Sequence, residues 1–275
     1  MARLMLMFLL FALNGVARAD VATWLGEAGL VEVDASAVPG WNNESSRTFQ
    51  VSAEDASSCV RITIGEKEYG LPLSRQEGAY EYLGTDNGEW GGELVATGPE
   101  GWRSVLLEDN IRSLVPTDDG LLVFTGLSHM GLRRGAVYRI DLPDREPKVE
   151  LVTLLPDAPA VFVPLESTAN RWRLAIIGSS SLMVLSRLSG RDQLQIALIE
   201  QPWSIAYPNS GVSMDGNIIL GMRGGIGVVQ SPKFFAQVPP PRYFTFRPPS
   251  EPSDEAEAAS DVEPTDFHVC SQESH

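Results

Sequence analysis

The sequence predicts an all-β protein in which a sheet unit repeats along the chain. Short apolar strands alternate with Gly, Asp and Asn turns, and there is little helical periodicity. Four strand segments end in a glycine, at intervals of 42, 52 and 43 residues: EGAYEYLG at Gly84, DGLLVFTG at Gly126, NRWRLAIIG at Gly178 and DGNIILG at Gly221. Each is followed within a few residues by a second apolar strand, so the repeating unit contains at least two strands.

Repeats of this length favour a β-propeller-like array of about four to six four-stranded sheets. One such sheet has two apolar faces and cannot bury both alone, whereas neighbouring sheets cover each other. A β-sandwich is the alternative, because it also uses many short strands. The regular recurrence of the whole unit favours the propeller-like array.

Residues 75–230 resemble the broad WD40/YVTN-like class of β-propeller repeat proteins, through the recurring turn, strand and glycine. None of the repeats carries the Gly-His and Trp-Asp pairs of the WD40 signature. The resemblance therefore implies a fold and a habit of binding partners, and it assigns no reaction.

Residues 1–19 have the pattern of a bacterial-type signal peptide. Arg3 precedes a short apolar run, and Ala17-Arg18-Ala19 matches the small-x-small pattern of a cleavage site. We expect a mature protein that starts at Asp20, is periplasmic or secreted, and has no lipid attachment, because no cysteine lies near the cleavage point. No later segment reaches the ~20 apolar residues that a membrane-spanning helix needs.

The chain is acidic, with a net charge of −15. Nucleic acid and anionic membranes are poor partners for such a surface, and a basic protein or peptide is a better one. The composition changes near residue 230, where a proline-rich stretch leads into an acidic segment with eight carboxylates after residue 250. We therefore expect a body at 20–230 and, at 231–275, a linker and a disordered tail from which Tyr243, Phe244 and Phe246 could dock back on the body.

The segment before the repeats is ambiguous. Residues 21–33 fit a short helix or a strand, and RTFQVSA and CVRITIG alternate as strands that either form a first sheet or close the ring. In an exported chain Cys59 and Cys270 could form a disulfide bond. Alternatively, Cys59 is a buried apolar residue and Cys270 a free thiol.

The stretch GTDNGEWGGELV at 84–95 lies where one strand of a repeat ends and the next begins. Asn87-Gly88 predicts a type I′ turn, and Gly91 and Gly92 predict a bulge or a close backbone approach. Trp90 stands between acids whose spacing does not match a calcium loop. We expect the acids to solvate the turn or to face a partner.

The equivalent connection in the next repeat holds Ser128 and His129, which point apart on a strand or turn and form no nucleophile–base pair by themselves. No G-x-S-x-G elbow, zinc ligand set or P-loop lysine is present in the body. The sequence thus predicts no catalytic residues, no metal site and no cofactor.

In a propeller-like array the equivalent turns of successive sheets gather on one face. This places a set of aromatic, Met, Arg and acidic residues, types that recur at protein interfaces, on a candidate partner-binding face. The set comprises Asp86, Glu89, Trp90, His129, Met130, Arg133, Arg134, Met222 and Arg223.

Three functions fit these patterns. The first is a non-catalytic binding protein for a protein or peptide partner, such as an inhibitor or immunity protein against a basic exported enzyme. The second is a carbohydrate-active hydrolase with a carboxylate pocket on the propeller face, in which Trp90 stacks on a sugar. The third is an envelope scaffold that recruits a basic partner through its tail. We favour the first.

Overall fold

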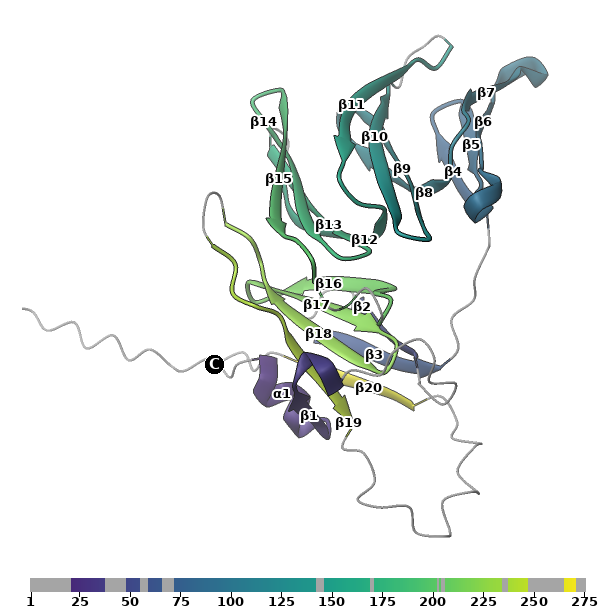
Figure 1. Ribbon diagram of the computed structural model, residues 1–275. Coiled ribbons are helices and arrows are strands. Elements are labelled where there is room, and N and C mark those ends of the chain that lie inside the picture. Colours follow the sequence, from purple (N-terminus) through teal and green to yellow (C-terminus); the bar gives the residue numbers. More distant parts are fainter. Residues whose placement is uncertain are drawn as a thin grey trace, which may run out of the picture.

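The computed structural model describes residues 21–37, 48–54, 59–65, 72–141, 146–168, 171–201, 203, 206–233, 237–246 and 265–270. Five antiparallel sheets contain all the strands in these residues (Figure 1). We number the sheets 1 to 5 in chain order, except that the sheet joined by the N-terminal strand β1 is numbered 5, because its other strands begin only at Ser210. The expected signal peptide at 1–19 lies outside the described residues.

Sheets 2, 3 and 4 are four-stranded meanders. Sheet 2 contains β4 (Leu73–Glu77), β5 (Tyr80–Gly84), β6 (Leu94–Thr97) and β7 (Arg103–Leu107). Sheet 3 contains β8 (Ile111–Thr117), β9 (Gly120–His129), β10 (Leu132–Ile140) and β11 (Val149–Leu155). Sheet 4 contains β12 (Pro159–Thr168), β13 (Arg171–Gly178), β14 (Leu182–Leu188) and β15 (Arg191–Leu198).

Sheets 5 and 1 combine strands from both ends of the chain. Sheet 5 contains β16 (Ser210–Met214), β17 (Asn217–Met222), β18 (Gly225–Gln230) and β19 (Arg242–Phe246), with β1 (Leu30–Val33) at its outer edge. Sheet 1 contains β2 (Thr48–Ala53), β3 (Cys59–Gly65) and β20 (Thr265–Cys270). The helix α1 (Val21–Glu27) and the 3₁₀ turns Ala35–Ala37, Gly88–Trp90 and Pro99–Gly101 complete the described elements.

The sheets follow one another through their first strands. β4 contacts β8, β8 contacts β12, β12 contacts β16, and β16 contacts β2, so each sheet stands beside the next (Figure 1). This confirms the predicted propeller-like array, with a sheet count inside the expected range. It is not the two-layered sandwich that was the alternative.

The four recurring glycine-terminated segments are the second strands of sheets 2 to 5, namely β5, β9, β13 and β17. Their terminal glycines permit close approach between elements. A Cβ at Gly84 would lie 2.6 Å from Cγ2 of Ile111 in β8, and one at Gly221 would lie 2.5 Å from the carbonyl oxygen of Phe49 in β2. At Gly84, Gly126 and Gly221 the recurrence therefore marks where the first strand of the next sheet packs, whereas a Cβ at Gly178 would meet Asp157 and Ser181.

Four apolar cores lie between consecutive sheets, from sheet 2 round to sheet 1. The core between sheets 5 and 1 includes α1, whose Val21, Trp24 and Leu25 are buried at helical spacing. This resolves the ambiguity of residues 21–33 into a helix followed by strand β1. No helix within the described ranges is long and apolar enough to cross a membrane.

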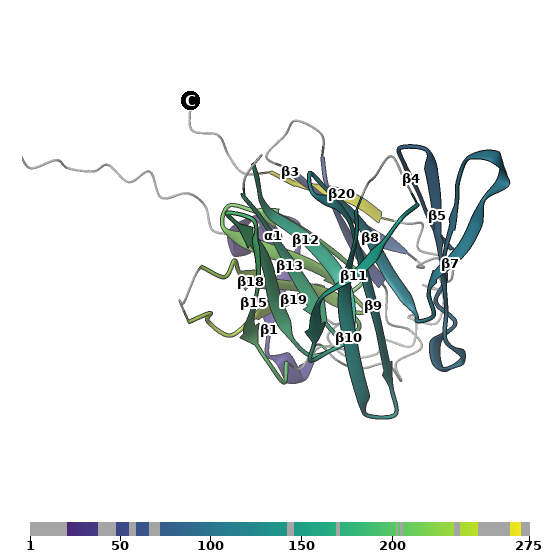
Figure 2. The same cartoon turned by 90° about the horizontal axis from the view of Figure 1, so that it is seen from above.

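Sheet 1 takes its third strand from the end of the chain. β20 pairs antiparallel with β3, and Cys270 lies directly opposite Cys59, to which it is disulfide-bonded (Figure 2). Both β19 and β20 fall in the segment that we assigned to linker and tail, so the expectation of disorder does not hold for these two strands. β19 carries Tyr243, Phe244 and Phe246, which we expected could dock back on the body, and Tyr243 and Phe244 are buried there. Composition failed to identify β20 because strand pairing uses backbone hydrogen bonds, which an acidic segment supplies as well as an apolar one.

Candidate functional site

The connection between β5 and β6 is longer than the predicted tight turn. Asn87 has a φ of −107°, so Asn87-Gly88 is not a type I′ turn; instead, Gly88–Trp90 forms one turn of 3₁₀ helix. The ends of the loop are joined by a hydrogen bond from the Thr85 N–H to the Glu93 carbonyl, 2.9 Å long. The predicted close approach is present at Gly92, where a Cβ would lie 3.0 Å from Cα of Asn110.

Both acids of this loop are engaged by cationic or ionisable groups of sheet 3. Arg112 of β8 donates to Oδ2 of Asp86 over 2.6 Å, and the other carboxylate oxygen accepts from the Gly88 N–H. Nε2 of His129, at the end of β9, lies 2.9 Å from Oε2 of Glu89. The predicted neighbours Asp86, Glu89 and His129 are therefore brought together, and they tie sheet 2 to sheet 3.

Three apolar side chains project from these tied loops into solvent. Trp90 is 85% exposed, Met130 is 93% exposed and Leu132 is 55% exposed. Trp90 follows Glu89 directly, and Met130 follows His129, so the contact between Glu89 and His129 joins the bases of the two turns. We call these three residues the apolar patch, and the end of the molecule that carries them the loop face.

Met130 occupies a strained backbone position. The two-residue turn Met130-Gly131 has positive φ at both residues, 47° and 85°, as a type I′ turn requires. Among the described residues, two other two-residue turns between strands have positive φ at both positions. They are Ser189-Gly190 and Asp215-Gly216, with a small polar residue at the first position. A methionine there gives up local stability, and its almost complete exposure offers no packing in return.

Residues just before β8, the first strand of sheet 3, hold the turns of the loop face in position. Asp109 accepts two hydrogen bonds from the Arg134 guanidinium, at 2.8 and 3.0 Å. Burial raises the pKa of Asp109, but hydrogen bonds from Arg134 and Asn110 outweigh it, so the pKa lies below its usual value. Asn110 is fully buried and donates to the Gly88 carbonyl over 2.7 Å.

The corresponding position of sheet 4 is Asp157, which is only 3% exposed. It accepts hydrogen bonds from the backbone of Ala158 and Ser180 and from the hydroxyls of Ser179 and Ser181. Burial raises the pKa of Asp157, but these hydrogen bonds outweigh it and hold the pKa below its usual value. Arg133 of β10 donates to the Ser180 hydroxyl, which connects the loop face of sheet 3 with that of sheet 4.

Two predicted residues do not belong to this group. Met222 is fully buried in the core between sheets 4 and 5. It is the last residue of β17, an inner strand of sheet 5 whose two faces are both buried, and its side chain lies on the face toward sheet 4. Arg223 follows it at the β17–β18 connection in sheet 5, two sheets beyond sheet 3, where its guanidinium lies 5.3 Å from the centre of the Tyr207 ring.

The sequence interpretation missed Arg112, Asp109, Asn110 and Asp157, which hold the loop face together. A signal existed, because an Asp or Asn stands just before the first strands β8, β12 and β16, at Asn110, Asp157 and Asn209. These three residues precede the first strands of their sheets, whereas the predicted site residues lie at or just beyond the ends of the second strands.

The loop face combines engaged carboxylates with exposed apolar side chains. The carboxylates of Asp86 and Glu89 are both engaged, and within the described residues no group of three or more His, Cys, Asp or Glu side chains is placed to hold a metal ion. What the loop face presents is an aromatic ring and two aliphatic side chains above a network of polar contacts. Such side chains on a rigid scaffold are typical of protein interfaces.

No family model and no curated protein matches the sequence. Solved structures that align with the chain include a luciferin-regenerating enzyme, with a TM-score of 0.41, 8% identity, and coverage of 78% of this chain and 80% of that one. A glucose dehydrogenase aligns with a TM-score of 0.35, 10% identity, and coverage of 68% and 82%. A bifunctional GH43-CE protein of Bacteroides eggerthii aligns with a TM-score of 0.32, 9% identity, and coverage of 62% of this chain but 27% of the other. These likenesses are too distant to transfer an activity.

Proposed function

We propose that the protein is an exported, non-catalytic binding protein that holds a basic protein or peptide against the apolar patch of its loop face. The observation that carries the proposal is the pair of adjacent turn tips, Trp90 and Met130, which are 85% and 93% exposed above tied loops. An exposed Trp next to an exposed Met is the kind of anchor that dominates binding energy at protein interfaces. The export signal of the sequence and the Cys59–Cys270 disulfide bond support an oxidising compartment.

The basic character of the partner follows from charge. The chain carries a net charge of −15, whereas the charges beside the apolar patch already face opposite charges. Long-range attraction would therefore speed the encounter with a basic partner, and the apolar patch would supply most of the affinity. An inhibitor or immunity protein for a basic exported enzyme is the specific form that we propose.

The test begins with the chain from residue 20 as bait in an envelope extract of the source cell, and continues with titration of the captured partner. We expect Trp90→Ala to weaken binding at least about 30-fold, as truncation of an interface anchor does. Leu188→Ala is the matched control, since Leu188 is 49% exposed but lies at the end of β14 that is opposite the loop face. Equal binding by wild type, Trp90→Ala and Met130→Asn would exclude the apolar patch.

The two other hypotheses give different outcomes. Turnover of a glycan that Glu89→Gln or Asp86→Asn abolishes would replace the binding proposal by the hydrolase. Deletion of residues 231–275 does not test the scaffold hypothesis, because it also removes β19 and β20 from their sheets. Charge-neutralising substitutions between residues 251 and 263 test it while keeping both strands.

A further inference from the structure

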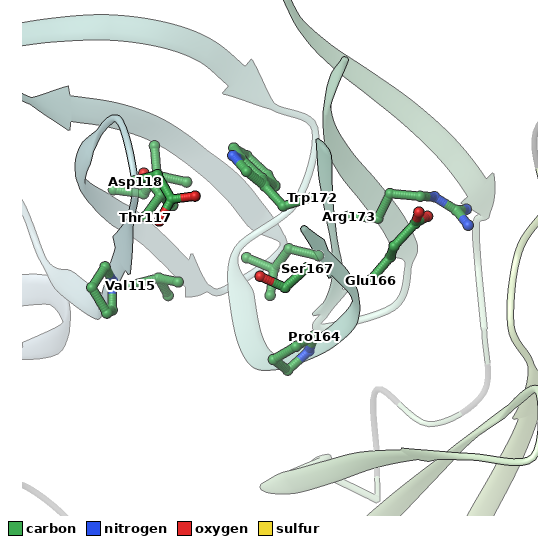
Figure 3. Close-up of a pocket in the computed structure, with 11 residues that line it drawn as sticks. Val115, Thr117, Asp118, Pro164, Glu166, Ser167, Trp172 and Arg173 are labelled. Atoms are coloured by element: carbon green, nitrogen blue, oxygen red, sulfur yellow. The ribbon is translucent and has the colours of Figure 1, made fainter. Parts of the chain in front are cut away.

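A pocket of about 380 Å³ opens between sheets 3 and 4, at the opposite end from the loop face (Figure 3). β8 begins at the loop face with Ile111 and ends at Thr117, and the pocket is lined by the last residues of β8 and of β12 and by the first residues of β13. The pocket is thus separate from the apolar patch. An inference about it goes beyond the proposed function.

The pocket combines an apolar wall with an aromatic ring. Leu122 and Leu174 are buried members of the core between sheets 3 and 4, and Val115 packs against the same core. Trp172 stands between Asp118 on one side and Arg173 on the other (Figure 3). A ligand in this space meets aliphatic carbon on one surface and an indole ring on another.

The charges around the pocket are unequally compensated. Arg173 donates to the Pro232 carbonyl, and Glu166 lies 3.1 Å from the guanidinium of Arg171. Asp118 has no hydrogen bond or ion pair with any other residue that the structure describes, although its neighbour Asp119 pairs with Arg187 over 2.6 Å. The charge left open at the pocket is therefore the negative charge of Asp118.

The position of Asp118 is fixed by a polar clamp beside the pocket. Asp192 of β15 accepts hydrogen bonds from Arg139 of β10 and from Arg187 of β14, and Arg187 in turn holds Asp119 in the β8–β9 turn. Arg139, Arg187 and Asp192 are mostly buried, with side-chain exposures of 11%, 17% and 18%. The clamp joins sheets 3 and 4 and preorganises the turn that carries Asp118, which lowers the cost of ordering it on binding.

We propose that this pocket binds a cationic group on an aliphatic stem, either a Lys or Arg side chain of a polypeptide or a free alkyl amine. The ammonium or guanidinium group pairs with the Asp118 carboxylate and lies against the Trp172 ring, which attracts cations through its electron-rich face. The aliphatic stem packs on Val115, Leu122 and Leu174, as the stems of Lys and Arg do on apolar surfaces. The net negative charge of the chain also favours a positively charged ligand.

The test is calorimetric titration of the full mature chain with four probes. These are Nα-acetyl-lysine methylamide, its arginine counterpart, the neutral norleucine isostere and butylamine, with glucose as a polyhydroxylated control. We expect the two cationic amino-acid probes to bind at least about tenfold more tightly than the norleucine isostere, since only they pair with Asp118. Tighter binding of the lysine derivative than of butylamine identifies a polypeptide source, and the reverse order identifies a free amine.

Variants separate the proposed contacts from general effects. Asp118→Asn is expected to weaken lysine binding roughly fivefold or more and to reduce its dependence on salt. Glu108→Gln, an exposed carboxylate between β7 and β8, is the control and should leave the affinity unchanged. Trp90→Ala should also leave it unchanged, so failure here is distinguishable from failure of the loop-face proposal.

Three results would overturn the inference. These are no binding of either cationic probe at millimolar concentration, equal binding of the norleucine isostere, and full affinity in Asp118→Asn. Glucose binding that Trp172→Leu abolishes and Asp118→Asn preserves would reassign the pocket to carbohydrate. Asp118 is exposed and makes no contact that folding depends on, so its variant tests the proposal even where Trp172→Leu reduces stability.

Discussion

The disulfide bond between Cys59 and Cys270 should be the largest single contribution to the stability of this fold. It joins residues 211 positions apart, and it holds a six-residue strand, β20, whose backbone pairs with β3. In the chain-entropy model a closed loop of this length removes about 18 cal/mol/K from the unfolded chain, or about 5 kcal/mol at 25 °C. Residual structure in the unfolded chain reduces the effect, so we expect a loss of about 3–5 kcal/mol in the double variant Cys59→Ala, Cys270→Ala.

The assay is urea unfolding, followed by tryptophan fluorescence and circular dichroism. A loss of this size is a large share of the ~5–15 kcal/mol that stabilises a folded domain, and it should lower the urea midpoint by more than about 1 M. Reduced wild type should unfold at the same urea concentration as the double variant. Reductant should not shift the double variant at all, which controls for unspecific effects of the reagent.

Hydrogen exchange locates the effect. Without the bond, β20 is held by its pairing with β3 and by the contact of Phe267 with Phe246, so it should open before the rest of the molecule. The β3 amides that pair with β20 should then exchange faster, while those that pair with β2 keep their protection. Identical midpoints for oxidised, reduced and double-variant protein would refute the assignment of β20 as a strand that depends on the bond.

Three smaller perturbations test other parts of the structure. Gly84→Ala should lower the free energy of unfolding by about 1–3 kcal/mol, because its Cβ would lie 2.6 Å from the buried Ile111; Gly26→Ala in α1, with nothing within 4 Å, should cause no loss in the same urea assay. Asp157→Ala should cost about 3 kcal/mol by leaving buried donors unpaired. Since folding lowers the pKa of Asp157, its contribution is present above the unfolded pKa near 4 and is lost as pH falls through the folded value; unfolding curves from pH 7 to pH 2 should show a smaller acid-induced loss in the variant than in wild type. Met130→Asn should raise stability by up to about 1 kcal/mol while weakening partner binding, and a stability loss would contradict the strain assigned to that turn.

Most of the fold could be predicted because its signal is local. A strand that ends in a glycine, followed by a turn and a second strand, is visible within about ten residues, and the four copies are equivalent strands of four consecutive sheets. Sheet 1 was only half visible, since β2 and β3 alternate clearly but β20 lies about 200 residues further on in an acidic segment. Its pairing with β3 through backbone groups leaves little trace in composition.

The candidate site shows the same limit. The turn at Met130 could be placed because it directly follows a long apolar strand. The sequence could not reveal that Glu89 of sheet 2 contacts His129 of the neighbouring sheet 3. Met222 was misplaced because we predicted a turn there, whereas β17 extends to it and both faces of that strand are buried. The sequence left undecided whether Cys59 and Cys270 form a disulfide bond, because their pairing depends on strand register, which only the fold supplies.

Polar and apolar residues of the loop face have separable roles, and this gives the binding proposal its sharpest form. The polar contacts of Asp86 with Arg112 and of Glu89 with His129 position the turns. Trp90 and Met130 are exposed and stabilise neither turn by packing. Substitution of Arg112 should therefore weaken binding of the partner indirectly, through loss of order in the loop, and should also lower the stability of the protein. Substitution of Trp90 should weaken binding of the partner without lowering the stability of the protein. A residue retained for the fold alone would show the opposite pattern, because its removal would change the unfolding curve first.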